Sequence, residues 1–145
     1  VLLTCAWHAR SSDAFAQRHG ATVWAPDPSA VTLDSPVHAL GDGDRSVGGV
    51  LVCDSGAPAP NREVAYRLDR RVLVVGDLIA AVDGRLTIAP AEWYRETAAT
   101  RSWHESHSRS AVRRLLEPAP ATVLCAHGRV DSPNAVAQLR RQVAE

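Results

Sequence analysis

Short apolar runs closed by turn residues dominate the hydrophobic pattern of this chain. The clearest run is Val72–Val75, which contains three β-branched residues and leads directly into Gly76-Asp77. Such a run is typical of a strand that is buried on both faces of a sheet. Asp77 would then lie at the rim of that sheet, where α/β proteins commonly place ligands and metal ions. The alternative is that Asp77 caps a turn or the next segment.

The same pattern predicts strands and helices along the whole chain. Strands are expected at residues 1–6, 21–25, 36–40, 48–53, 63–69, 71–75, 85–89 and 121–126. Helices are expected at residues 13–19, 91–100, 106–117 and 133–145. Polar and apolar positions alternate over residues 63–69, which predicts a half-exposed strand, and Asp83-Gly84 predicts a hairpin. The strand–helix–strand order over residues 1–25 favours parallel pairing, and we expect one α/β domain over residues 1–145.

Composition narrows the classes of partner. The chain has 145 residues, of which 46% are hydrophobic and 22% charged, so it can bury one ordinary globular core. Its formal net charge is zero, which gives no basis for a nucleic-acid partner or an anionic membrane. No apolar run approaches the length of a transmembrane helix, and no signal-peptide pattern is present, so we expect a cytoplasmic protein. Cys5, Cys53 and Cys125 form no CxxC pair and are predicted to be small buried apolar residues.

Three of the predicted strands end in side chains that can bind a metal ion. Asp77 follows residues 71–75, His127 follows residues 121–126, and His8 follows residues 1–6. If these strands point the same way in one sheet, the three side chains share a rim. Carboxylate and imidazole groups together suit zinc, manganese or iron. A single histidine after a strand is more often a turn or core residue, which is the alternative for each histidine.

The order of these motifs resembles the metallo-β-lactamase fold superfamily. The matching features are Thr4-x-x-Trp7-His8 before a helix, Gly76-Asp77-Leu78 after a buried strand, and His127-Gly128 before the last helix. The resemblance implies an αββα sandwich with a one- or two-metal hydrolase site, in which Asp77 takes the place of the metal-bridging Asp and His127 that of the last His ligand. It covers nearly all of this chain but only the later part of a typical member. Since the sequence opens inside an apolar run at Val1, we expect an N-terminally truncated domain.

The sequence departs from this family at most of the other ligand positions. Where the family has T-H-x-H-x-D-H, this chain places Cys5, Trp7, Ala9 and Arg10 at the four ligand positions. A shift of one residue is needed to bring His8 into a ligand place. The family's middle His falls near residues 55–58, where this chain has none. Because a metal ion generally needs at least three protein ligands, the resemblance implies no metal or one weakly bound zinc, with manganese or iron as alternatives.

Arg10 has two interpretations, one functional and one structural, and so does the pair His104 and His107. Arg10 could hold a phosphate or carboxylate of a small-molecule ligand. The sequence favours the alternative, a salt bridge from Arg10 to Asp77 that fills the vacant metal position. His104 and His107 are three residues apart and could form a ligand pair on a helix. A polar segment between two helices is the favoured interpretation of these histidines.

Two functions follow from these residues. The first is a degenerate, non-hydrolytic member that acts as a binding or structural module. The second is a mononuclear hydrolase in which a metal ion at Asp77, His127 and His8 activates water against an ester, thioester or phosphoester, with Asp77 as the catalytic residue. Loss of most of the first motif favours the former, and the fold alone names no substrate. The missing strands would leave edges unpaired, so we also predict self-association.

Overall fold

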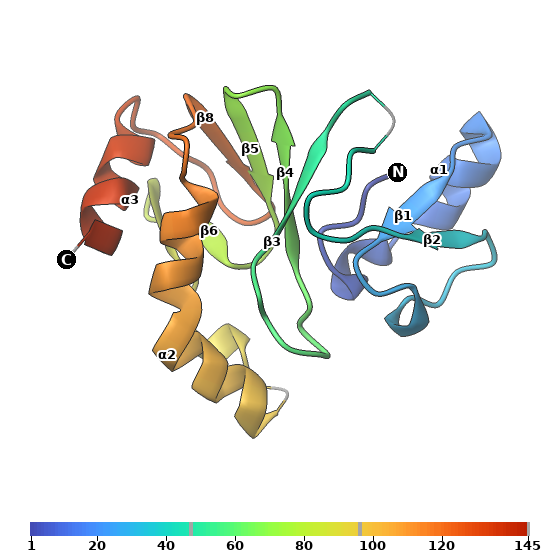
Figure 1. Cartoon of the computed structure of the whole chain (residues 1–145), viewed down its shortest axis with the longest axis horizontal. Coiled ribbons are helices and arrows are strands. Elements are labelled where there is room, and N and C mark those ends of the chain that lie inside the picture. Colours follow the sequence, from blue (N-terminus) through green and yellow to red (C-terminus); the bar gives the residue numbers. More distant parts are fainter. Residues whose placement is uncertain (47, 96, 145) are drawn as a thin grey trace.

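A four-stranded sheet forms the centre of the computed structural model, which describes residues 1–46, 48–95 and 97–144. Its strands, in spatial order, are β3 (Leu51–Asp54), β4 (Val64–Leu68), β5 (Val72–Val75) and β8 (Thr122–Cys125). β4 pairs antiparallel with both β3 and β5, whereas β8 runs parallel to β5. In Figure 1 the sheet stands between a helical layer, α2 and α3, and an N-terminal layer. The expected mixed α/β class is confirmed.

β5 contacts a layer on each of its faces, as its apolar run predicts. Leu73 and Val75 pack into the core that the sheet shares with the helical layer. Val74, which points the opposite way, packs against the core shared with the N-terminal layer. Alternate side chains of a strand point to opposite faces, so a strand covered on both sides needs apolar residues at every position.

The helical layer consists of two helices and a hairpin. Their bounds are α2 (Ala98–Leu115), α3 (Ala135–Ala144), β6 (Ile79–Val82) and β7 (Arg85–Ile88). Leu78, Ile79 and Leu86 are almost fully buried against these helices, together with Val112 and Leu139. The hairpin turns at Asp83-Gly84, as expected, with both residues at positive φ. None of the helices in the described ranges is long and apolar enough to cross a membrane.

The expectation of two helices over residues 91–117 is wrong. A short 3-10 turn, η3 (Ala91–Trp93), is followed by the single continuous helix α2. α2 begins at a capping box in which Thr97 and Thr100 satisfy each other's backbone N–H groups. The polar run after residue 100 therefore lies within one helix and not between two. His104 is buried with Nε2 2.9 Å from the Ala89 carbonyl oxygen, whereas His107 is exposed, so these histidines form no ligand pair.

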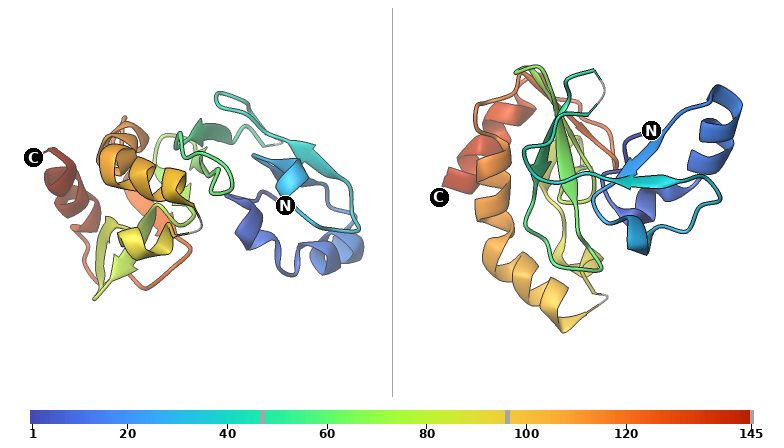
Figure 2. Two further views of the ribbon diagram at one scale, coloured as in Figure 1. Left: turned by 90° about the horizontal axis from the view of Figure 1, so that it is seen from below. Right: turned by 45° about the vertical axis from the view of Figure 1, so that its right-hand side comes forward.

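The N-terminal layer lies on the other face of the sheet (Figure 2), where it packs against β3, β4 and Val74 of β5. Its elements are η1 (Ala6–Ala9), α1 (Ser12–His19), β1 (Val23–Ala25), η2 (Pro28–Ala30) and β2 (Val37–Ala39). β1 and β2 form a parallel pair, and Ala16 of α1 packs on Val23 and Ala25 of β1. A small core of its own thus holds this layer together.

The strand expected over residues 1–6 forms only at its beginning. Leu2 makes an isolated parallel bridge to Trp24, which agrees with the expected parallel pairing. Beyond it, the Thr4 carbonyl accepts a hydrogen bond from the Val64 N–H at 2.8 Å, and the chain then turns into η1. Pairing with β4 of the central sheet therefore ends the extended segment at Thr4.

β4 was expected to be half-exposed, but Val64 to Arg67 are all buried. Val64 and Tyr66 face the N-terminal layer, and Ala65 faces the helical layer. The Arg67 guanidinium donates hydrogen bonds to the carbonyl oxygens of Leu115, at 2.6 Å, and Pro118, at 2.9 Å. These carbonyls lie at the C-terminal end of α2, where the helix dipole favours a cation. The polar positions of β4 are thus satisfied inside the protein and not by solvent.

Candidate metal centre

Asp77, His8 and His127 meet at one edge of the central sheet. The Asp77 Oδ1 atom lies 3.1 Å from His8 Nε2 and 2.9 Å from His127 Nε2. Asp77 and His127 come together because each follows the end of a strand, and the last residues of these parallel strands, Val75 and Cys125, are paired. The structure therefore brings together the three side chains that the sequence places at one rim. Their role as metal ligands stays a prediction.

His8 reaches the site from η1 and is held at both ring nitrogens. Its Nδ1 lies 2.7 Å from Thr4 Oγ1, while its Nε2 faces Asp77. The hydrogen bond to Asp77, with a further one to Cys5, raises the pKa of His8 to about 10. Burial opposes ionisation of Asp77, but hydrogen bonds and charge from His8 and His127 outweigh it and lower the pKa of Asp77. Without a metal ion, the site is thus an ion pair of imidazolium and carboxylate.

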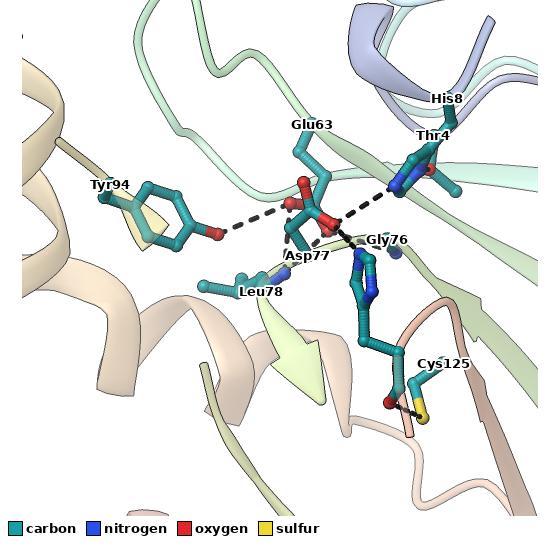
Figure 3. Close-up of polar contacts among 9 residues, drawn as sticks. Thr4, His8, Glu63, Gly76, Asp77, Leu78, Tyr94 and Cys125 are labelled. Atoms are coloured by element: carbon teal, nitrogen blue, oxygen red, sulfur yellow. Dashed lines mark hydrogen bonds and ion pairs between the residues drawn. The ribbon is translucent and has the colours of Figure 1, made fainter. Parts of the chain in front are cut away.

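A buried carboxylate, Glu63, supports the turn that carries Asp77. Its Oε1 accepts hydrogen bonds from the N–H groups of Gly76 and Leu78, each at 3.1 Å, and its Oε2 accepts one from the Tyr94 hydroxyl at 3.5 Å (Figure 3). Burial raises the pKa of Glu63 to about 7. Gly76 has no room for a side chain, since a Cβ there would lie 2.7 Å from Thr4 Oγ1 and 3.0 Å from Glu63 Oε1. These contacts hold the Gly76-Asp77 turn in place.

Sequence reasoning missed Glu63 and Cys5. Glu63 begins the segment 63–69, in which polar and apolar residues alternate, and this alternation predicted that the polar side faces solvent. The pattern does not show that another part of the chain covers that side. Cys5 is buried, as expected, with 1% of its surface exposed. Its Sγ nevertheless belongs to the site, because the ligand atoms of Cys5, His8 and Asp77 all lie within 4.8 Å of one another. The signal for Cys5 was its place at the family's first ligand position.

The expected salt bridge between Arg10 and Asp77 is wrong. Asp77 is paired with His8 and His127, and Arg10 is exposed at the end of η1. Within the described ranges, Arg10 takes part in no ion pair. The 3-10 turn of η1 brings His8 to the carboxylate and ends at Arg10, so the imidazole takes the place expected for the guanidinium. Whether Arg10 holds an anionic ligand stays a prediction.

A double-mutant cycle tests this pairing. In chelator, we expect Asp77→Asn and His8→Gln to be coupled by more than roughly 1 kcal/mol in the free energy of unfolding, because the pair is largely shielded from water. Asp77→Asn and Arg10→Gln should instead be additive within about 0.5 kcal/mol. Urea unfolding of the single and double variants measures both values. Coupling with Arg10 and additivity with His8 would contradict the observed geometry.

Comparison with known proteins adds no family assignment. No protein-family model matches the chain, and no curated protein matches it. The positions of Cys5, His8, Asp77 and His127 are therefore the basis for assigning a function.

Proposed function

We propose that this chain is a divergent protein of the metallo-β-lactamase fold that lacks a full dinuclear metal site and acts as a binding or structural module. The layered arrangement supports this proposal, since α2 and α3 lie on one side of the central sheet and the N-terminal strands and α1 lie on the other. The meeting of Gly76-Asp77 with His127-Gly128 at adjacent strand ends also agrees with that fold. Neither feature by itself names a ligand.

The observation that carries the proposal is the shortage of donors around Asp77. Two of the residues at the family's ligand positions, Trp7 and Arg10, point into solvent, and Ala9 has no donor atom in its side chain. Among the described residues, Cys5, His8 and Asp77 form the one compact group of metal-binding side chains. A two-metal site needs separate ligand sets about 3.5–4 Å apart. The donors present can serve one ion at most.

Metal analysis and a hydrolysis assay together test this function. We expect no more than one zinc ion per chain in protein purified without chelator. We also expect the zinc- or manganese-loaded protein to hydrolyse ester, thioester and phosphoester substrates no faster than its Asp77→Asn variant. Two tightly held ions per chain, or turnover that Asp77→Asn abolishes, would contradict the proposal.

A mononuclear hydrolase is the second candidate, and the exposure of His127 favours it. The His127 side chain is 49% exposed and the Asp77 side chain 23% exposed, so solvent reaches the carboxylate beside His127. If Cys5, His8 and Asp77 hold the ion without His127, a fourth position stays open, as catalytic zinc sites require. The metal would then supply an activated water for attack on an ester, thioester or phosphoester. Turnover that depends on added metal and survives His127→Gln would favour this candidate.

Self-association through the sheet edge is also proposed. β8 forms one edge of the described central sheet, and its Leu124 is 52% exposed. An unprotected edge strand with an exposed apolar side chain favours pairing with another chain. We therefore expect sedimentation velocity at tens of micromolar to show a dimer or larger species, which Leu124→Asp shifts to the monomer. A wild-type protein that sediments as a monomer would contradict this.

A further inference from the structure

Cys5 and His8 are brought to the same side of η1 by the geometry of that turn. Cys5 is the N-cap residue, and the His8 N–H donates to the Cys5 carbonyl at 3.3 Å. Cys5 has extended backbone and His8 ends the regular part of the turn, and together they bring the thiol and the imidazole to the same place. Asp77 reaches that place from the end of β5.

The separations of these side chains suit one small cation. The ligand atoms of Cys5, His8 and Asp77 all lie within 4.8 Å of one another. Zinc bonds of about 2.3 Å to sulfur and about 2.0–2.1 Å to nitrogen imply ligand atoms roughly 3.5 Å apart in a tetrahedral site. Side-chain rotations that shorten these separations by about 1.3 Å or less would therefore be enough.

Two groups support these ligands, and His127 lies beside them. His127 Nε2 is 2.9 Å from Asp77 Oδ1 but stands outside the compact group of three ligand atoms. Thr4 Oγ1 orients His8 through its Nδ1, and Glu63 holds the turn on which Asp77 sits. Hydrogen bonds of this kind fix the orientation of metal ligands and tune their affinity.

We infer that Cys5 is a metal ligand, and that the site binds one zinc ion through the Cys5 thiolate, His8 and Asp77. This rests on the proposed function, in which the donors serve one ion at most, and narrows it to a thiolate-ligated ion. The soft sulfur donor selects zinc over manganese, and magnesium is disfavoured for the same reason. Three protein ligands leave the fourth tetrahedral position to water or to a bound small molecule. On binding, the thiol proton of Cys5 and the proton between His8 and Asp77 pass to solvent.

Cobalt substitution tests the assignment, because a thiolate bound to Co(II) gives a near-ultraviolet charge-transfer band that imidazole and carboxylate do not give. We expect the band in the full wild-type chain loaded with Co(II), and its loss when zinc is added. Cys5→Ser and Cys5→Ala should lack the band. Matched controls Cys53→Ser and Cys125→Ser should keep it. Zinc affinity should fall by about tenfold or more in Cys5→Ala, as expected for loss of a ligand.

The double variant Cys53→Ser/Cys125→Ser keeps the test decisive if the Cys5 variants fail to fold, because Cys5 is then the one cysteine left. A band in that variant confirms the assignment. Wild-type protein that binds cobalt without the band, that keeps the band in Cys5→Ser, or that binds neither cobalt nor zinc would overturn it. Hydrolysis by the zinc-loaded protein would contradict the proposed function but leave the Cys5 assignment intact. If Cys5 is not a metal ligand, the proposed function as a binding module without metal would still stand.

Discussion

Gly128→Ala is expected to lower the free energy of unfolding by about 3 kcal/mol or more, because it adds both overlap and backbone strain. Gly128 has a φ of +82°, and a Cβ there would overlap the carbonyl oxygen of Ala81 and lie 2.8 Å from its carbonyl carbon. The carbonyl group of Ala81 belongs to the backbone of β6, so it cannot move aside as a flexible side chain would. The Ala81 N–H donates to the His127 carbonyl at 2.9 Å, so relief of the overlap would also displace His127. Urea unfolding in chelator measures the loss.

Gly20→Ala is the matched control for this change. Gly20 also has a positive φ, of +59°, but a Cβ there would meet nothing within 4 Å. Its substitution should therefore cost only the strain of the left-handed backbone, about 1–2 kcal/mol. Equal losses in the two variants would show that the close approach of Gly128 to Ala81 does not decide the stability.

The metal-free protein is expected to lose about 3 kcal/mol of stability between pH 4.5 and pH 7, because Glu63 holds its proton more tightly in the folded chain. Burial raises the pKa of Glu63 from 4.5 to about 7, although the Leu78 N–H favours the ionised form. A raised pKa means that its contribution is fully present below pH 4.5 and is lost as the pH passes 7. Urea unfolding in chelator at pH 4.5, 6 and 7.5 measures the change.

Glu63→Gln should flatten this part of the pH profile. The amide stays uncharged and can still accept from the backbone, so the variant should match the wild type at pH 4.5 and exceed it at pH 7.5. Glu105→Gln, on the exposed side of α2, is the control that should keep the wild-type profile. A wild-type stability that rises between pH 4.5 and pH 7 would contradict the expectation.

His8 acts mainly above this range, and Asp77 acts below it. The raised pKa of His8, about 10, means that its contribution to stability is present below pH 6.5 and is lost as the pH rises toward 10. The pKa of Asp77 is lowered, so its contribution is present above its usual 3.8 and is lost as the pH falls.

Local sequence determined the strands and turns that frame the site. The run Val72–Val75 is apolar and mostly β-branched, and Asp83-Gly84 forms the tight turn of the hairpin with both residues at positive φ. Such preferences act over a few residues, so they predict the strand and the turn from the sequence without knowledge of the rest of the fold. The meeting of Asp77 and His127 was predictable because both follow strands that end at the same edge.

Only the tertiary structure decided what surrounds Asp77. Alternation over residues 63–69 indicated solvent, but it could not show that backbone N–H groups from a distant turn would enclose Glu63. Pairing of Thr4 with Val64, sixty residues away, bends the chain into η1. That bend turns Cys5 and His8 toward Asp77 and leaves Arg10 in solvent. These outcomes depend on contacts between segments that are far apart in the sequence. The periodicity of polar and apolar residues along the chain does not predict such contacts.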